Sequence, residues 1–282
     1  MPVGVTRPAW AFIAFTVICI AAALMLPAVP QPVEYHHFAD QRAILGVEHF
    51  LNIVSNFGFL IAGLAGLALL AGGRGRFEAS RERWPYAVFF LGLLLTAPGS
   101  TYYHLAPDNE TLFWDRLPMT IAFMGLVASQ VVDRISVRAG LALLGPMLLV
   151  GVASVVYWRA TERVGAGNVL PYAILQGYTV VGVLMLAWLA PSRYTRGSDL
   201  YFVFGWYVFS KILEALDAHV MAFNQIVSGH TLKHVAASVA GLVIVRMLWK
   251  RSSRAPAYPL PDSLPDSFHQ AAEERIRRSP DQ

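Results

Sequence analysis

The chain has 282 residues, of which 56% are hydrophobic and 14% charged, and its mean hydropathy is +0.49. This balance excludes an ordinary soluble domain and indicates an all-α integral membrane protein that crosses the bilayer several times. The single cysteine, Cys19, excludes an intrachain disulfide and a zinc site built from cysteines. The net charge of +4 lies in short loops beside apolar runs, so it indicates membrane topology rather than nucleic-acid binding.

Eight apolar runs are long enough to cross a bilayer as helices, which takes about 20 residues each. They cover residues 10–29, 50–72, 85–104, 114–132, 140–158, 169–190, 200–222 and 230–249. Residues 1–30 form either an N-terminal transmembrane helix or a signal sequence, and residues 31–250 form the main membrane domain. The segment 251–282 is rich in proline and mixed charge, which predicts a disordered tail.

Basic residues are distributed unevenly between the two sides of this threading. One set of alternate loops holds Arg7, Arg74, Arg76, Arg81, Arg83, Arg134, Arg138, Arg193, Arg196, Arg246, Lys250, Arg251 and Arg254. The opposite set holds Arg42, Arg159 and Arg163, with Arg116 and Lys233 at the ends of spans. Cytoplasmic loops are enriched in Lys and Arg, so we expect both termini, and the tail, to be cytoplasmic.

Ionisable residues gather at the opposite, outer side. His104 ends the third run there, Asp115 begins the fourth, and His230 and His234 begin the last. Residues four apart share one face of a helix, so His230 and His234 can reach a single metal ion, and Ser100 shares a face with His104. Three imidazoles and a water are typical of an open zinc site, and hydrogen-bonded interhelical histidines are the alternative.

These residues carry a resemblance to a known family. The segments "PGSTYYHLAPDNETLFWDRLPMTIAFM", "SGHTLKH" and "FLNIVSNFGFL" resemble the alkaline ceramidases. That family belongs to a superfamily of seven-helix membrane metal-dependent hydrolases, which also includes the progestin and adipoQ receptors. The resemblance implies a seven-transmembrane-helix core preceded here by one extra N-terminal helix, which makes eight spans.

The resemblance also implies an activity, namely zinc-dependent cleavage of the amide bond of a ceramide or another N-acyl lipid to a fatty acid and an amine. His104, His230 and His234 would be the zinc ligands and Asp115 the general base, although a carboxylate near a helix N-terminus can also be structural. Ser100 would support the metal site or the oxyanion, and its rival role is that of a covalent nucleophile. The lipid in the bilayer is the only partner implied. A lipid-responsive receptor with a structural zinc and no turnover is the alternative function.

Three charged residues step along one face of the run 200–222, namely Lys211, Glu214 and Asp217. They predict a ladder of interhelical salt bridges, because charges inside a membrane protein are expected to find partners. Asp217 could instead orient a ligating imidazole through its second ring nitrogen.

Further polar candidates lie in and before the second run. Asn52, Ser55 and Asn56 share a face and are expected to form interhelical hydrogen bonds or to contact substrate. The ceramidases carry an acidic cluster implicated in calcium binding before their first core span. Asp40 and Glu48 are the candidates for it here, in a segment that does not reproduce the family's acidic pattern.

Overall fold

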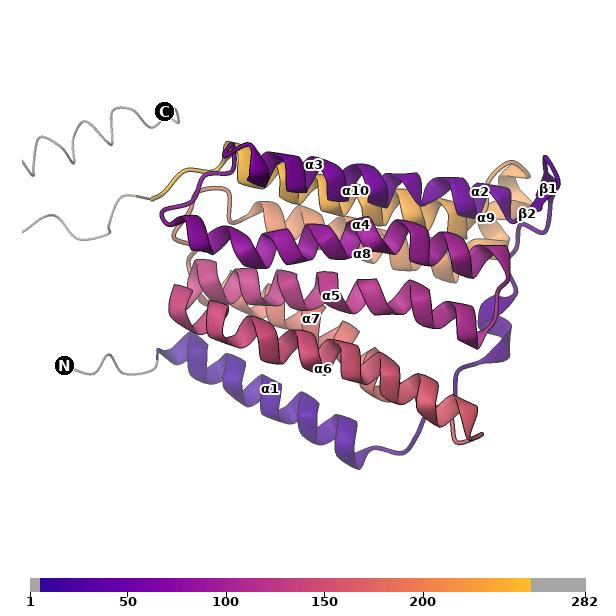
Figure 1. Cartoon of the computed structure of the whole chain (residues 1–282), viewed down its shortest axis with the longest axis horizontal. Coiled ribbons are helices and arrows are strands. Elements are labelled where there is room, and N and C mark those ends of the chain that lie inside the picture. Colours follow the sequence, from indigo (N-terminus) through magenta and orange to yellow (C-terminus); the bar gives the residue numbers. More distant parts are fainter. Residues whose placement is uncertain (1–5, 255–282) are drawn as a thin grey trace, which may run out of the picture.

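The computed structural model describes residues 6–254, which form a bundle of long helices (Figure 1). The helices are α1 (Arg7–Met25), α2 (Phe50–Ser55), α3 (Phe57–Ala71), α4 (Trp84–Leu105), α5 (Asn109–Arg134), α6 (Val137–Arg163), α7 (Leu170–Leu189), α8 (Asp199–Ala215), α9 (Asp217–Asn224) and α10 (Gly229–Lys250). Short 3₁₀ turns, η1 (Val33–His36) and η2 (Ser80–Arg83), precede the β-hairpin and α4. The hairpin pairs β1 (Ala43–Ile44) antiparallel with β2 (Val47–Glu48), with Ala43 opposite Glu48.

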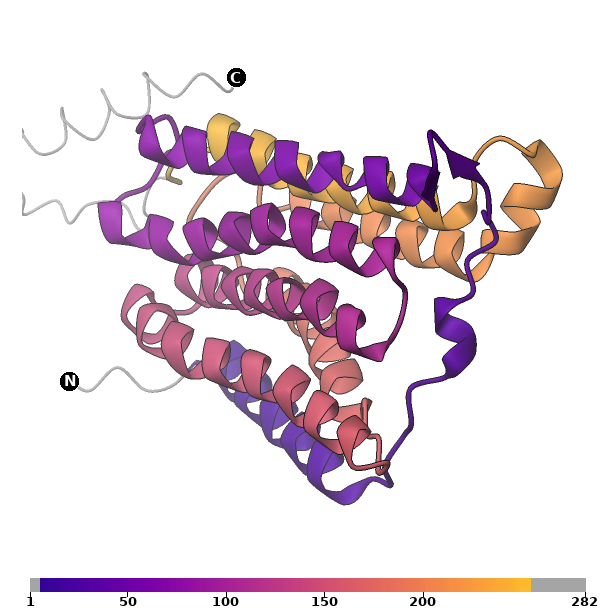
Figure 2. The ribbon, with the colours of Figure 1, turned by 45° about the vertical axis from the view of Figure 1, so that its right-hand side comes forward.

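Each predicted apolar run is helical, but two of the runs are divided. The run 50–72 consists of α2 and α3, which meet at Asn56, and the run 200–222 consists of α8 and α9, which meet at Leu216. At the second division, Gly229 at the start of α10 packs closely against the backbone of Leu213 and Asp217. The seventh run is therefore a shorter helix than predicted, followed by α9 at the end of the bundle (Figure 2).

Five helices in the described part of the chain are long and apolar enough to cross a membrane: Arg7–Met25, Phe50–Ala71, Val137–Arg163, Leu170–Leu189 and Gly229–Lys250. The helices α4, α5 and α8 run alongside them in Figure 1. Helix α5 packs against α4, α6 and α7, and its residues from Ala122 onward are mostly buried. A helix enclosed by other helices can carry polar residues that a lipid-facing helix cannot, which explains the lower hydropathy of α5.

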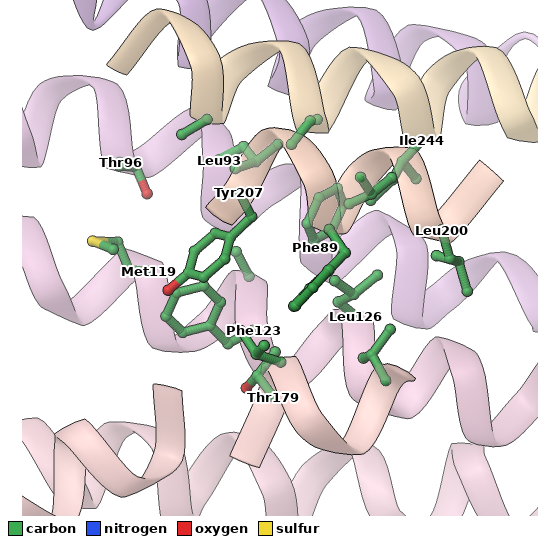
Figure 3. Close-up of a pocket in the computed structure, with 18 of the residues that line it drawn as sticks. Phe89, Leu93, Thr96, Met119, Phe123, Leu126, Thr179, Leu200, Tyr207 and Ile244 are labelled. Carbon is green, nitrogen blue, oxygen red and sulfur yellow. The ribbon is translucent and has the colours of Figure 1, made fainter. Parts of the chain in front are cut away.

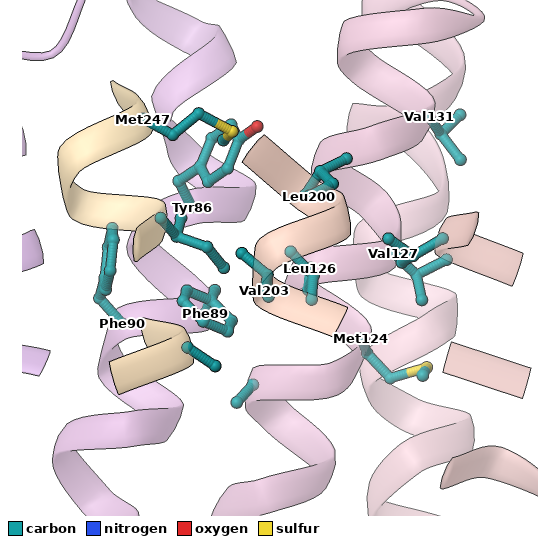
Figure 4. Packing of buried hydrophobic residues seen from close by; sticks show 14 of the residues in the cluster. Tyr86, Phe89, Phe90, Met124, Leu126, Val127, Val131, Leu200, Val203 and Met247 are labelled. Atoms are coloured by element: carbon teal, nitrogen blue, oxygen red, sulfur yellow. The ribbon is translucent and has the colours of Figure 1, made fainter. Parts of the chain in front are cut away.

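The hydrophobic core lies where α4, α5, α8 and α10 meet (Figure 4). It includes Tyr86, Phe89 and Phe90 from α4, Met124, Leu126, Val127 and Val131 from α5, Leu200 and Val203 from α8, and Met247 from α10. Glycine permits the close approach of α4 and α5, because a Cβ atom at Gly125 would lie 2.6 Å from the backbone nitrogen of Phe89. The close approach at glycine thus brings together α4, which carries Ser100, and α5, which carries Asp115.

Helix α1 begins and α10 ends at the same end of the bundle, as the predicted threading requires (Figure 1). The fold extends past the predicted start of the tail at residue 251, because Arg251 is 1% exposed and donates a 2.7 Å hydrogen bond to Asp133 Oδ2. Ser253 also forms a β-bridge with Tyr194. The rest of the predicted tail, residues 255–282, lies outside the described residues.

Candidate metal centre and its cavity

Three buried histidines converge at the end of the bundle opposite to the start of α1 and the end of α10. His104 lies in the last turn of α4, and His230 and His234 lie in the first two turns of α10. One ring nitrogen of each lies within 4.8 Å of one ring nitrogen of each of the others. The ring centroids are 5.0 Å apart for His104 and His230, 5.1 Å for His104 and His234, and 4.9 Å for His230 and His234. The predicted convergence of these residues is confirmed, and the cluster could hold a metal ion.

The hydrogen bonding of the imidazoles also fits a metal. Both ring nitrogens of His104 and Nε2 of His230 are buried without a hydrogen-bond partner among the described residues. Leaving buried polar atoms unpaired is costly, so such atoms call for an explanation in a native structure. Three neutral imidazoles are a donor set that zinc accepts in open, catalytic sites. The residues present therefore fit a zinc ion, although imidazole also binds other transition metals.

Ser55, at the end of α2, fixes the orientation of His234. Its hydroxyl donates to the carbonyl of Asn52 at 2.8 Å and lies 2.8 Å from Nδ1 of His234. Since the hydroxyl proton is used on Asn52, the serine oxygen accepts the proton of Nδ1. The lone pair of His234 is then on Nε2, which is the atom left to bind a metal.

Asn52 and Asn56 form hydrogen bonds that hold α2 in place. The Asn52 side-chain oxygen accepts a 2.7 Å hydrogen bond from the Thr231 hydroxyl on α10, and Asn56 donates to the Asn52 carbonyl. Both side chains are buried. The predicted interhelical hydrogen bonds are thus present for Asn52 and Ser55, whereas Asn56 bonds within its own segment.

Asp217, the first residue of α9, positions the start of α10. Its carboxylate accepts a 2.7 Å hydrogen bond from the backbone N–H of His230 and a 2.9 Å one from the backbone N–H of Ala39. The predicted bond from Asp217 to an imidazole nitrogen is therefore replaced by a bond to the histidine backbone. Asp217 still supports the position of His230, because its carboxylate links α9 to the start of α10 and to the loop before the β-hairpin.

The predicted interhelical salt bridge is formed by Glu214 on α8 and Lys233 on α10, whereas the pair of Lys211 and Glu214 lies within α8. Glu214 pairs with Lys211 and also with Lys233, whose Nζ is 2.6 Å from Glu214 Oε1. One carboxylate thus links two ammonium groups across α8 and α10. Asp217 is not part of this ladder.

A polar cavity of about 280 Å³ lies beside the histidines. Five of the predicted site residues line it, namely Ser100, Asp115, Lys211, Glu214 and His234. Of the three histidines only His234 is in the lining. The helix-cap role considered for Asp115 belongs to another residue: Asp108 caps α5 by accepting a 2.7 Å hydrogen bond from the Thr111 N–H. Asp115 lies almost two turns further on, where it is free to face the cavity.

An apolar pocket of about 140 Å³ adjoins the polar cavity (Figure 3). The two spaces share Phe59, Thr96, Met119, Tyr207 and Ala237 in their walls. Beyond these residues the pocket continues between α4, α5, α8 and α10, where Phe89, Leu93, Phe123, Leu126, Leu200 and Ile244 line it. The combined space is polar near the histidines and apolar toward the core of the bundle.

The calcium candidates do not form a cluster of ligands. Asp40 is buried, and its two carboxylate oxygens accept 2.7 Å hydrogen bonds from Arg42. The hydrogen bonds from Arg42 hold the pKa of the Asp40 carboxyl below its ordinary value. Glu48 is exposed, and neither residue belongs to a group of three or more potential metal ligands within residues 6–254. Asp40 instead holds Arg42 at the hairpin, where Arg42 also donates to the carbonyls of Gln225 and Ile226.

Two features of the site carry no clear signal in the sequence. Phe38, in the loop before the hairpin, packs its ring 4.7 Å from His104 and 4.5 Å from His230 between centroids. Arg116 was counted in the sequence only as a charge at a span end, yet it is buried and lines the cavity. Its place directly after Asp115 in "WDRLPM" is the one signal that could have linked it to the site.

Comparisons with protein-family models, with curated proteins and with solved structures gave no match.

Proposed function

We propose that this protein is an integral-membrane zinc amidohydrolase that cleaves the amide bond of a ceramide or another N-acyl lipid. The observation that carries the proposal is a buried three-histidine cluster with unpartnered nitrogens beside a cavity that contains a carboxylate and a hydroxyl. The adjoining apolar pocket supports a lipid substrate, because an acyl chain needs a space free of polar atoms next to the reacting amide.

In this proposal His104, His230 and His234 hold the zinc ion. Bound zinc activates a water near neutral pH and offers a positive centre for the developing oxyanion. Asp115 accepts the proton of the attacking water and returns it to the departing amine, which requires a carboxylate within the cavity. The Ser100 hydroxyl donates a hydrogen bond to the oxyanion, while the acyl chain occupies the apolar pocket.

The proposed membrane placement follows the basic loops. All eight predicted runs, including α4, α5 and α8, would cross the bilayer, with both chain ends cytoplasmic. The histidine cluster then lies toward the outer leaflet. A lipid could reach it from the bilayer without crossing the polar loops.

Metal analysis combined with a release assay tests this function. The purified protein should contain about one zinc per chain and should release fatty acid from at least one N-acyl lipid. The double variant His230→Ala/His234→Ala should lose both properties. Asp115→Asn should keep its zinc and lose turnover by about 10²- to 10⁴-fold, since it removes only the proton acceptor.

Two matched controls belong to this experiment. His219→Ala removes an exposed histidine from α9, and Glu110→Gln removes an exposed carboxylate from the same helix as Asp115; both should keep zinc and turnover. Metal-free protein, or full turnover in Asp115→Asn, would contradict the proposal. Lipid binding without any turnover, together with loss of thermal stability on zinc removal, would favour the receptor alternative.

A further inference from the structure

Arg116 on α5 has an unusual environment for an arginine. The residue is 5% exposed, and its guanidinium lies over three aromatic rings. The distances from its Cζ atom to the ring centroids are 4.4 Å for Trp158, 4.8 Å for Tyr172 and 5.4 Å for Tyr35. These rings come from α6, α7 and the loop after α1, so three separate segments hold the guanidinium at the cavity wall.

The guanidinium has no carboxylate partner among the described residues. Its Nη2 donates a 2.6 Å hydrogen bond to the neutral side chain of Gln31, and its buried Nη1 has no partner. The other strongly buried arginine, Arg251, is different, because it pairs with Asp133 at 2.7 Å. A buried charge without a counter-ion is expensive, and Arg is the side chain best suited to bind a planar anion in a fork.

The other charges of the cavity do not neutralise Arg116. Lys211 and Lys233 are already two cations on the single carboxylate of Glu214. Asp115 is the other carboxylate in the lining, and it does not form an ion pair with Arg116. Three cations against two anions leave one positive charge in excess before any metal binds.

We propose that Arg116 binds an anionic group, a carboxylate or a phosphate, on the amine side of the N-acyl lipid substrate. This inference rests on the proposed function and narrows its substrate class to anionic N-acyl lipids. The amine side is indicated because Arg116, Gln31 and Tyr35 line the polar cavity and not the apolar pocket that would take the acyl chain. The unpartnered Nη1–H of Arg116 supplies a hydrogen-bond donor for the anion, and the excess positive charge of the cavity attracts it.

Two probes of equal chain length test the proposal. N-Dodecanoylglycine ends in a carboxylate, and N-dodecanoylethanolamine ends in a hydroxyl at nearly the same distance from the amide. The wild-type protein should favour the glycine probe in kcat/KM by about tenfold or more, which corresponds to about 1.4 kcal/mol. Arg116→Gln should lower kcat/KM for the glycine probe by more than for the ethanolamine probe, so that the preference disappears, and Arg116→Lys should keep part of it.

Arg159→Gln is the matched control, because Arg159 also stacks on an aromatic ring but pairs with Glu110 outside the cavity. It should leave the preference unchanged. Equal kcat/KM for the two probes in the wild type would overturn the proposal, and this outcome needs no variant to fold. An equal loss for both probes in Arg116→Gln, with normal zinc content, would also overturn it by showing a structural role alone.

Binding separates this inference from the proposed function. Both probes are also measured as competitors of a fluorescent fatty-acid analogue bound to the wild type. A preference for the anionic probe that depends on Arg116, without any hydrolysis, would retain the anion site and reject the amidohydrolase. Comparison of N-dodecanoylethanolamine phosphate with N-dodecanoylglycine, as competitors and as substrates, shows whether the site prefers a phosphate or a carboxylate. Inhibition by dodecanoic acid that depends on Arg116 would place the product's carboxylate there and overturn the assignment to the amine side.

Discussion

The Ser55 hydroxyl selects which nitrogen of His234 can bind a metal. Because it donates to Asn52 and accepts from Nδ1 of His234, the imidazole is held in one tautomer and one orientation. His104 has no such partner among the described residues, so its orientation depends on packing, including that against Phe38. At the scale of single residues, α2 therefore orients one histidine of the candidate metal centre without contributing a histidine itself.

Ser55→Ala should weaken zinc binding by about 10- to 100-fold, which is the usual cost of losing the hydrogen bond behind a ligating histidine. The variant should remain folded, since the side chain removed is small. Competition with a chromophoric chelator measures the affinity. Ser154→Ala, which removes a buried hydroxyl bonded within α6, is the control and should keep wild-type affinity. Unchanged affinity in Ser55→Ala would show that packing alone orients His234.

The sequence predicted the convergence of the three histidines but not the contacts of the residues around them. His104, His230 and His234 could be linked because each lies at a helix end on the same side of the threading. The partners of Arg116 could not be found in this way, because Trp158 and Tyr172 are distant in sequence and only the packing of α6 and α7 against α5 brings them together. Asp217 was recognised as important, but its bond to a backbone N–H leaves no pattern in the sequence.

At the scale of helices, the contact between α4 and α5 sets the geometry of the cavity. Gly99 precedes Ser100, and a Cβ atom at this position would clash with the carbonyl oxygen of Trp114, the neighbour of Asp115. The two side chains proposed to act on the substrate thus face each other across a contact that has room for glycine alone.

Gly99→Ala should destabilise the protein by about 1–3 kcal/mol, because the added methyl group must separate two packed backbones. Turnover should fall as well, since separation of α4 and α5 moves Ser100 away from Asp115. Gly145→Ala on α6 is the matched control: nothing lies within 4 Å of its Cβ position, and alanine there should stabilise the helix by up to about 1 kcal/mol. Thermal unfolding in detergent measures both, and equal melting temperatures would contradict the tight contact.

At the scale of the whole molecule, composition predicted where helices form but not how each meets the bilayer. All eight apolar runs are largely helical, although Pro98, Pro118 and Pro146 lie inside three of the helices. A helix satisfies its own backbone hydrogen bonds, which an apolar segment in a bilayer requires, and neighbouring helices make proline tolerable there. Whether a helix faces lipid depends on its neighbours, and α5, enclosed by other helices, is not among the five helices selected by length and hydropathy. The division between α8 and α9 lies beside a tight contact with Gly229 of α10, which the sequence of the run 200–222 does not reveal.

The proposed membrane topology predicts on which side of the bilayer each loop lies. If all eight runs cross the membrane, the loop before η2 and the β-hairpin lie on opposite sides, with the basic loop cytoplasmic. In a Cys19→Ser background, Ser80→Cys and Leu45→Cys place single thiols at two exposed positions. A membrane-impermeant maleimide added to intact cells should label Leu45→Cys and leave Ser80→Cys unlabelled.

Both variants should react once detergent opens the membrane, which controls for the reactivity of each thiol. Labelling of Ser80→Cys alone in intact cells would invert the orientation and place the histidine cluster at the cytoplasmic face. Labelling of both variants in intact cells would place residues 45 and 80 on the same side of the membrane. The segment of α2 and α3 between them would then not span the bilayer. The first outcome would change which leaflet supplies the substrate, and the second would remove the spanning role of the segment that carries Ser55.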